Sequence, residues 1–168
     1  MKQTIIKYGI YGAIAICMLF LISWFVLDDL PLSTQEALGY LSMILSLSFV
    51  FFGIKHYRDK QNDGKVSFKS ALIIGVFISL ITAFMFGVLD VVYVEVLNPD
   101  FMEMYYTETL KTMEETMSSE EFNTTKAEME AQKKLFTNPI MTFLFMALTV
   151  FVIGFIISLL SALVLQRK

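Results

Sequence analysis

ALIIGVFISLITAFMFGVLDVVYV, residues 71–94, is an apolar stretch long enough to cross a membrane, and it holds the most regular pattern in the chain. A helix rises 1.5 Å per residue, so about 20 apolar residues cross the ~30 Å hydrocarbon core of a bilayer. Small residues recur at every fourth position of the stretch: Ala71, Gly75, Ser79, Ala83 and Gly87. This spacing places them on one ridge of a helix, where another helix can approach closely. We therefore expect residues 71–94 to form the central helix of a membrane bundle.

Three other stretches are similarly apolar, namely residues 8–27, 37–54 and 140–165. Hydrophobic residues make up 56% of the 168 residues and are gathered in long runs, which is typical of membrane proteins. The sequence therefore predicts an all-α fold, a bundle of four transmembrane helices. We expect residues 1–168 to form a single membrane domain.

The start of the chain also has features of a cleavable signal peptide. Lys2 and Lys7 form a basic segment, and residues 13–15 match the Ala-x-Ala pattern of a cleavage site. Because few apolar residues precede that match and the apolar run continues to Leu27, we expect a retained membrane anchor. Cys17 is the single cysteine, so it forms no intramolecular disulfide, and we interpret it as a packing residue.

The distribution of charge predicts which helix ends face the cytoplasm. Basic residues precede the first span, whereas residues 28–36 after it hold three acids and no Lys or Arg. The loop between the second and third spans holds five basic residues: Lys55, Arg58, Lys60, Lys65 and Lys69. Since positive charge marks the cytoplasmic side, both termini and this loop should be cytoplasmic, and residues 98–138 extracytoplasmic. We interpret the basic loop as a topology determinant; contact with anionic lipid headgroups or a cytosolic partner is the alternative.

Asp90 is the one acidic residue inside an apolar run, and an intramembrane carboxylate is a candidate functional residue. It lies roughly 28 Å along the helix from Ala71, close to the outer boundary of the hydrocarbon core. We therefore interpret it first as a carboxylate near the lipid headgroups. The alternative is an outward-facing acidic cluster of Asp28, Asp29 and Asp90 that attracts a cation or a basic partner.

Residues 98–138 are too long and too regular in their hydrophobic pattern to be a simple connection. Apolar residues at helical spacing run through the first half: Met102, Tyr106, Leu110, Met113 and Met117. Ser118 and Glu121 have the spacing of a capping box, so a second helix should begin there. We predict an extracytoplasmic amphipathic helical hairpin between the third and fourth spans, in which acidic residues outnumber the four lysines.

Methionines are frequent in this segment: Met102, Met104, Met113, Met117 and Met129. Their thioethers would suit Cu(I). Methionine is also a common filler of helix seams and adaptable partner surfaces. Because no Cys or His accompanies these methionines, we favour packing or partner contact, and we predict no metal site and no cofactor.

The fourth span begins with Asn138 and Pro139, the pattern of a helix cap followed by proline at the first helical position. Within the span, small residues again recur at every fourth position, at Gly154, Ser158 and Ala162. We expect this seam to dock against the ridge of the third span.

Several short strings distributed over the chain together point to a known family. They are Gly39-Tyr40-Leu41-Ser42-Met43, Phe51-Phe52-Gly53-Ile54-Lys55, Tyr57-Arg58-Asp59, Gly64-Lys65-Val66-Ser67-Phe68 and Asn98-Pro99-Asp100-Phe101. With them the chain resembles, over nearly its whole length, the bacterial membrane proteins grouped as domain of unknown function 4199 (DUF4199). The resemblance implies an integral bacterial membrane protein with several helices, and we expect a multi-pass protein of the bacterial cytoplasmic (inner) membrane. It implies no catalytic residues that could be transferred to this chain.

The sequence contains no motif that names a reaction, such as a phosphate-binding Gly-rich loop, HExxH or CxxC. His56, the single histidine, lies in the basic loop, apart from the acids predicted on the opposite side, which argues against a Ser-His-Asp site. We therefore expect a non-enzymatic membrane protein without a nucleic-acid partner. It should self-associate as a homo-oligomer or bind a protein partner through the hairpin. The alternative is a small transporter or channel subunit that uses Asp90.

Overall fold

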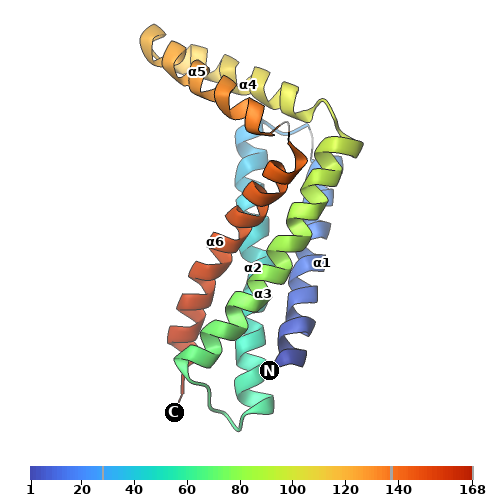
Figure 1. Ribbon diagram of the computed structural model, residues 1–168, viewed down its shortest axis with the longest axis vertical. Helices are drawn as coiled ribbons and strands as arrows, with labels where there is room; N and C mark the ends of the chain where they lie inside the picture. Colours follow the sequence, from blue (N-terminus) through green and yellow to red (C-terminus); the bar gives the residue numbers. More distant parts are fainter. Residues whose placement is uncertain (28, 137, 168) are drawn as a thin grey trace. The chain divides into compact units, whose positions relative to one another are not determined.

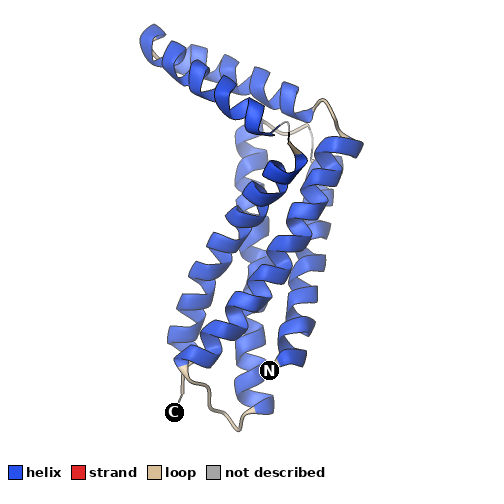
Figure 2. Ribbon diagram, in the orientation of Figure 1, coloured by secondary structure: helices blue, strands red, loops and turns tan. Residues whose placement is uncertain are grey.

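The computed structural model describes residues 1–27, 29–136 and 138–167. Figure 2 shows that these residues are mostly helical. The helices are α1 (Lys2–Val26), α2 (Leu32–Gln61), α3 (Phe68–Val92), α4 (Phe101–Thr116), α5 (Ser119–Phe136) and α6 (Pro139–Leu165), with a π-helical turn, η1 (Tyr93–Leu97), directly after α3. Four of them are long and apolar enough to cross a membrane: α1, α2, α3 with η1, and α6. For the described residues, the predicted all-α class is confirmed, as is the presence of four helices long and apolar enough to span a membrane.

The chain divides into two compact units. Unit 1 comprises Met1–Phe86 and Met146–Lys168, and unit 2 comprises Gly87–Phe145. The boundary between them falls within α3 and within α6, so each unit contains part of both helices. The predicted insertion, residues 98–138, therefore belongs to a unit that also includes the adjoining ends of two spanning helices.

The spanning helices extend beyond the apolar stretches from which they were predicted. The clearest case is α2, which runs from Leu32 to Gln61 although only residues 37–54 are apolar. A helix keeps its backbone hydrogen bonds where the sequence becomes polar, and its polar ends can enter the aqueous phase. At the start of α6, the predicted cap is confirmed, because Asn138 Oδ1 accepts a hydrogen bond from the Ile140 N–H at 2.9 Å.

In unit 1 the helices make close contacts at glycines, and Figure 1 shows α1, α2, α3 and α6 running alongside one another. Gly9 of α1 lies against Ile81 of α3, where an added Cβ would come within 2.6 Å of the Ile81 Cδ1. Gly53 of α2 lies against Ile78 of α3 and Tyr8 of α1. The core of this unit includes the fully buried Ile16, Leu47, Val50, Ile74, Ile78 and Val150. Small residues thus bring the backbones together around a largely apolar core.

The outward faces of these helices are apolar as well. Large side chains that are half or more exposed occur on every spanning helix of unit 1, among them Phe25, Ile44, Phe77 and Leu160. A helix that is apolar on its exposed side as well as its buried side is typical of a lipid environment. The outer surface of unit 1 therefore supports the membrane assignment independently of helix length.

Both termini and the α2–α3 loop meet at one end of unit 1, which we call the basic end. The Met1 amine donates a hydrogen bond to Gln61 Oε1 at 3.3 Å, and Arg58 Nη1 donates to the Leu165 carbonyl at 3.4 Å. Val66 and Arg167 form an isolated antiparallel β-bridge. Gly64 has φ +78°, a left-handed conformation that glycine adopts readily in a tight turn. An even number of crossings between the termini accounts for this arrangement.

In unit 2 the π-helical turn has a local cause. Pro99 disfavours α-helical geometry at Asn98, which has φ −143° and ψ 72°. The Asn98 N–H then bonds to the Tyr93 carbonyl at 2.8 Å, and its side-chain amide donates to the Tyr93 hydroxyl at 3.0 Å. The Tyr93 ring in turn contacts Phe101 at a centroid distance of 5.4 Å, which anchors the start of α4.

Helices α4 and α5 contact each other and form the α4–α5 pair. The predicted capping box at its turn is confirmed: the Glu121 N–H donates to Ser118 Oγ at 3.4 Å, and the Ser118 N–H donates to the Glu121 carboxylate at 3.3 Å. Hydrogen bonds from Ser118 lower the pKa of Glu121. Lys133 of α5 pairs with Glu103 of α4 and lies 5.3 Å from the ring centroid of Tyr106. Burial raises the pKa of the Tyr106 phenol, and the Lys133 charge opposes that shift.

Candidate functional site

The small-residue ridge of α3 lies against the small-residue seam of α6 in unit 1. A Cβ added to Gly75 would lie 2.7 Å from the Ser158 Cβ, and one added to Gly154 would lie 2.5 Å from the Ser79 Oγ. The two hydroxyls, Ser79 Oγ and Ser158 Oγ, are 3.3 Å apart. Each also donates to the carbonyl four residues earlier in its own helix. The members in this unit are all buried: Ala71, Gly75, Ser79, Ala83, Gly154, Ser158 and Ala162. The ridge therefore joins two helices of one chain.

Gly87, the remaining ridge residue, belongs to unit 2. A Cβ at this position would approach within 2.8 Å of the Phe143 ring and 3.1 Å of the Phe143 carbonyl oxygen. Gly87 therefore permits close packing between the unit 2 portions of α3 and α6. A residue with a Cβ at this position would require the Phe143 ring to shift.

Asp90 lies one turn beyond Gly87 and is buried. Only 4% of its surface is exposed, and its Oδ2 has no hydrogen-bond partner among the described residues. A buried carboxylate oxygen without a hydrogen-bond partner is costly in an apolar environment, so such groups are usually retained for a function. The depth estimate from the sequence suggested a carboxylate near the headgroups, but it gave no sign that neighbouring side chains would cover the group.

The suggested outer cluster contains two other acids, Asp28 and Asp29. Asp28 lies outside the described residues, and Asp29 is exposed. An acidic cluster that includes Asp90 therefore stays a prediction. Among the described members of the cluster, Asp90 is the buried one, and its burial supports a functional role.

The five residues of the basic loop are distributed over the basic end of unit 1. Lys55, Arg58 and Lys60 belong to the last turns of α2, Lys65 to the loop and Lys69 to the first turn of α3. Arg58 has a structural role, because its Nε donates to Asp59 Oδ1 at 2.6 Å and its Nη1 donates to the Leu165 carbonyl of α6. The four lysines are exposed, so they present their charge to solvent or lipid headgroups.

Sequence reasoning missed the contact between Gly12 of α1 and Thr82 of α3. A Cβ on Gly12 would lie 2.5 Å from Thr82 Oγ1, whose proton is donated to the Ile78 carbonyl at 3.1 Å. It also missed the ring contact between Tyr8 and His56, at a centroid distance of 5.5 Å. The small residues of the first span indicated that another helix could approach closely. Which helix does so depends on the packing of the whole bundle.

The methionines of the α4–α5 pair do not form a common buried seam. Met104 is 55% exposed and Met117 is 39% exposed, whereas Met102, Met113 and Met129 are half-buried. Tyr106 is the buried side chain of α4. The pair therefore has a thin apolar contact along its length and a surface of acidic residues and methionine.

Comparison with known proteins identifies the family. The model of the family described as "Protein of unknown function (DUF4199)" matches residues 7–167, which is almost the whole chain. The chain belongs to the DUF4199 family. Neither the curated proteins nor the solved structures gave a match. The DUF4199 assignment confirms the resemblance seen in the sequence.

Proposed function

We propose that this DUF4199 protein is a non-enzymatic, multi-pass protein of the bacterial cytoplasmic membrane whose α4–α5 pair binds a basic protein partner outside the cytoplasm. In this proposal all four long apolar helices cross the membrane, so that the termini and the α2–α3 loop lie on one side and residues 98–138 on the other. The excess of Lys and Arg at the basic end favours the cytoplasm for that side.

The exposed surface of the α4–α5 pair carries the proposal. It combines exposed acids, such as Glu108, Glu114 and Glu115, with the exposed thioethers of Met104 and Met117. Acidic groups favour a partner with positive charge, and methionine adapts its shape to an apolar surface. Two short helices with a thin apolar contact gain stability when a partner covers them.

Self-association through the small-residue ridge is not part of the proposal. The ridge residues of unit 1 are buried within the chain, so a second chain finds no ridge surface to approach. A homo-oligomer would have to use the large exposed apolar side chains on the outer faces. Those faces are equally suited to lipid.

The proposal predicts that neutralising the acids of the α4–α5 pair abolishes recovery of a partner. The test compares the full chain, a chain lacking residues 100–137, and the Glu108→Gln/Glu114→Gln/Glu115→Gln variant, each purified from native membranes in lipid nanodiscs. Glu103 and Glu121 stay unchanged because they stabilise the pair. The same partner should accompany the full chain in a salt-sensitive way and be lost from both variants.

The matched control is Lys111→Gln/Lys126→Gln, which changes the same surface but makes it more negative. This variant should recover the partner at least as well as the full chain. Recovery that is equal in all four proteins, or that is lost equally with the lysine variant, would contradict binding through negative charge.

Asp90 supports a second candidate function, a small transporter or channel subunit. The buried Oδ2 without a hydrogen-bond partner could take up a proton or bind a small cation, either of which would supply the missing interaction. The three prolines fall outside the apolar stretches of the spans, which argues against the broken helices common at transporter sites. This function therefore ranks second.

Flux through liposomes tests the second function. Asp90→Asn should lower the proton or monovalent-cation flux of the reconstituted full chain at least tenfold, because the amide cannot ionise at neutral pH. Asp29→Asn, which removes a charge from an exposed acid, should leave the flux unchanged. A wild-type flux no greater than that of empty liposomes would reject this function, and so would an undiminished flux in Asp90→Asn.

A further inference from the structure

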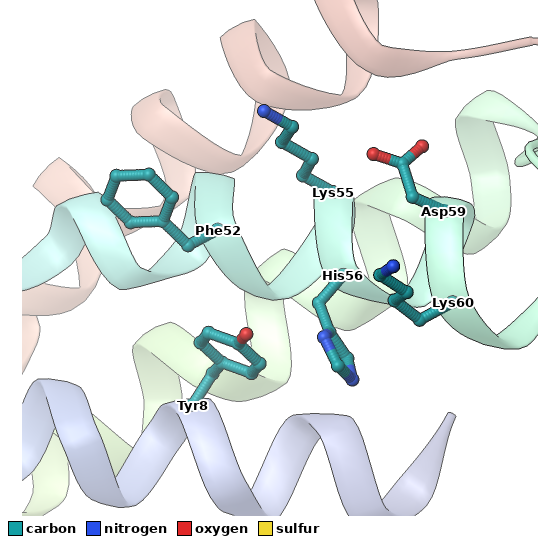
Figure 3. Close-up of a pocket in the computed structure, with 6 residues that line it drawn as sticks. All are labelled: Tyr8, Phe52, Lys55, His56, Asp59 and Lys60. Carbon is teal, nitrogen blue, oxygen red and sulfur yellow. The ribbon is translucent and has the colours of Figure 1, made fainter.

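A shallow hollow opens at the basic end of unit 1, with a volume of about 210 Å³. Its lining comes from two helices: Tyr8 of α1 and Phe52, Lys55, His56, Asp59 and Lys60 of α2. Figure 3 shows the five α2 side chains spaced along the last turns of the helix; His56 extends toward α1, where Tyr8 lies, whereas Lys55 and Asp59 project from the other side of α2. The hollow lies where the apolar run of α2, which ends at Ile54, gives way to charged residues.

The lining changes character along the last turns of α2. The α2 positions follow a helical repeat, so Phe52 is succeeded one turn later by Lys55 and His56, and another turn later by Asp59 and Lys60. Phe52 is 50% exposed on the apolar side. From Phe52 to Lys60 the helix rises roughly 12 Å, a length comparable to a phospholipid headgroup with its glycerol. One end of the hollow suits an acyl chain and the other suits an anion.

The net charge of the hollow is positive, because its one carboxylate is already paired. Asp59 Oδ1 and Oδ2 accept hydrogen bonds from Arg58 Nε at 2.6 Å and Arg58 Nη2 at 3.2 Å. Neither Lys55 nor Lys60 forms an ion pair within the part of the chain that the structure describes. Lys7, which lies 5.9 Å from the Tyr8 ring centroid, adds a third positive charge beside the hollow.

We propose that this hollow binds the phosphate group of an anionic phospholipid, with Lys55 and Lys60 on the phosphate and Phe52 against the acyl chain. A basic hollow between membrane helices at the level of the headgroups is the arrangement that such lipids recognise. The lipid identity follows from the exposed aromatic ring, because a free phosphate ion would gain nothing from Phe52. The assignment does not depend on the α4–α5 pair or on Asp90.

Native mass spectrometry of the full chain tests the proposal with phosphatidylglycerol and phosphatidylcholine as the probe lipids. Wild-type protein should prefer phosphatidylglycerol, and Lys55→Gln/Lys60→Gln should weaken its binding about 30-fold. The matched control, Lys65→Gln/Lys69→Gln, removes the same charge from exposed positions at the same end, and its affinity should change less than about threefold. An equal loss in both variants, or no lipid preference in the wild type, would overturn the proposal.

A second arm separates a lipid from a free anion. Phe52→Ala should weaken phosphatidylglycerol binding several-fold, and millimolar inorganic phosphate should fail to displace the lipid from wild-type protein. Complete displacement by phosphate, together with unchanged lipid binding in Phe52→Ala, would overturn the lipid assignment in favour of a free phosphate ion. Because all three side chains are exposed, thermal unfolding of each variant should match the wild type.

Discussion

Replacing Gly154 with alanine is expected to destabilise unit 1 by about 2 kcal/mol, as is typical of an overpacked core. The new Cβ would lie 2.5 Å from Ser79 Oγ, 2.6 Å from Ser79 Cβ and 3.1 Å from Leu47 Cδ2. Ser79 is fully buried and cannot move away without separating α3 from α6. Thermal or denaturant unfolding of the full chain in detergent or bicelles measures the loss.

Two further variants make the result specific to this contact. Gly39→Ala is the matched control, because its Cβ would meet only the Phe20 ring at 3.7 Å, an ordinary van der Waals distance. Adding Ser79→Gly to Gly154→Ala should recover most of the lost stability, since it removes the two closest atoms. An equal cost at Gly39 and Gly154, or no recovery in the double variant, would contradict direct packing of the ridge against the seam.

Much of the fold could be predicted because bilayer thickness determines how long an apolar run in the sequence must be. The length of each apolar run is fixed by the hydrocarbon core, so the four spans were evident without tertiary information. The caps at Ser118 and Asn138 were equally accessible, since a cap depends on residues within one turn. The four long apolar helices and the two caps were therefore predicted correctly, whereas the π-helical turn before Pro99 was not predicted.

Features that depend on how the helices pack against one another could not be predicted from the sequence. The i+4 ridge of α3 indicated that some helix would approach it, but the spacing is the same whether the partner is α6 or a second chain. The contacts of Gly9 and Gly12 with Ile81 and Thr82 depend on how α1 is rotated in the bundle. Periodicity along one helix carries no information on that rotation.

Asp90 illustrates the limit for the candidate site. Counting residues gives an approximate depth in the membrane, whereas burial depends on which side chains surround the carboxylate. The hollow beside Lys55 and Lys60 was missed for the same reason. The basic loop was visible as a run of charge, but the contribution of Tyr8 from α1 and the pairing of Asp59 with Arg58 required the structure.

Membrane topology is the prediction with the largest expected effect, because the accessibility of a residue to a membrane-impermeant reagent outside the cell is all or none. Four crossings require the α2–α3 loop and the α4–α5 pair to lie on opposite sides of the membrane. The basic residues around the termini and in the α2–α3 loop favour the cytoplasm for that side. The proposed extracytoplasmic partner assumes this orientation.

The most direct test is the labelling of single cysteines by a membrane-impermeant maleimide in intact spheroplasts. Cys17→Ser removes the one native thiol, and Glu115→Cys or Lys65→Cys then introduces a reporter at an exposed position. Glu115→Cys should label in intact spheroplasts, and Lys65→Cys should label only after permeabilisation. Labelling of both positions in intact spheroplasts, or of Lys65→Cys alone, would contradict a four-span protein with an extracytoplasmic α4–α5 pair.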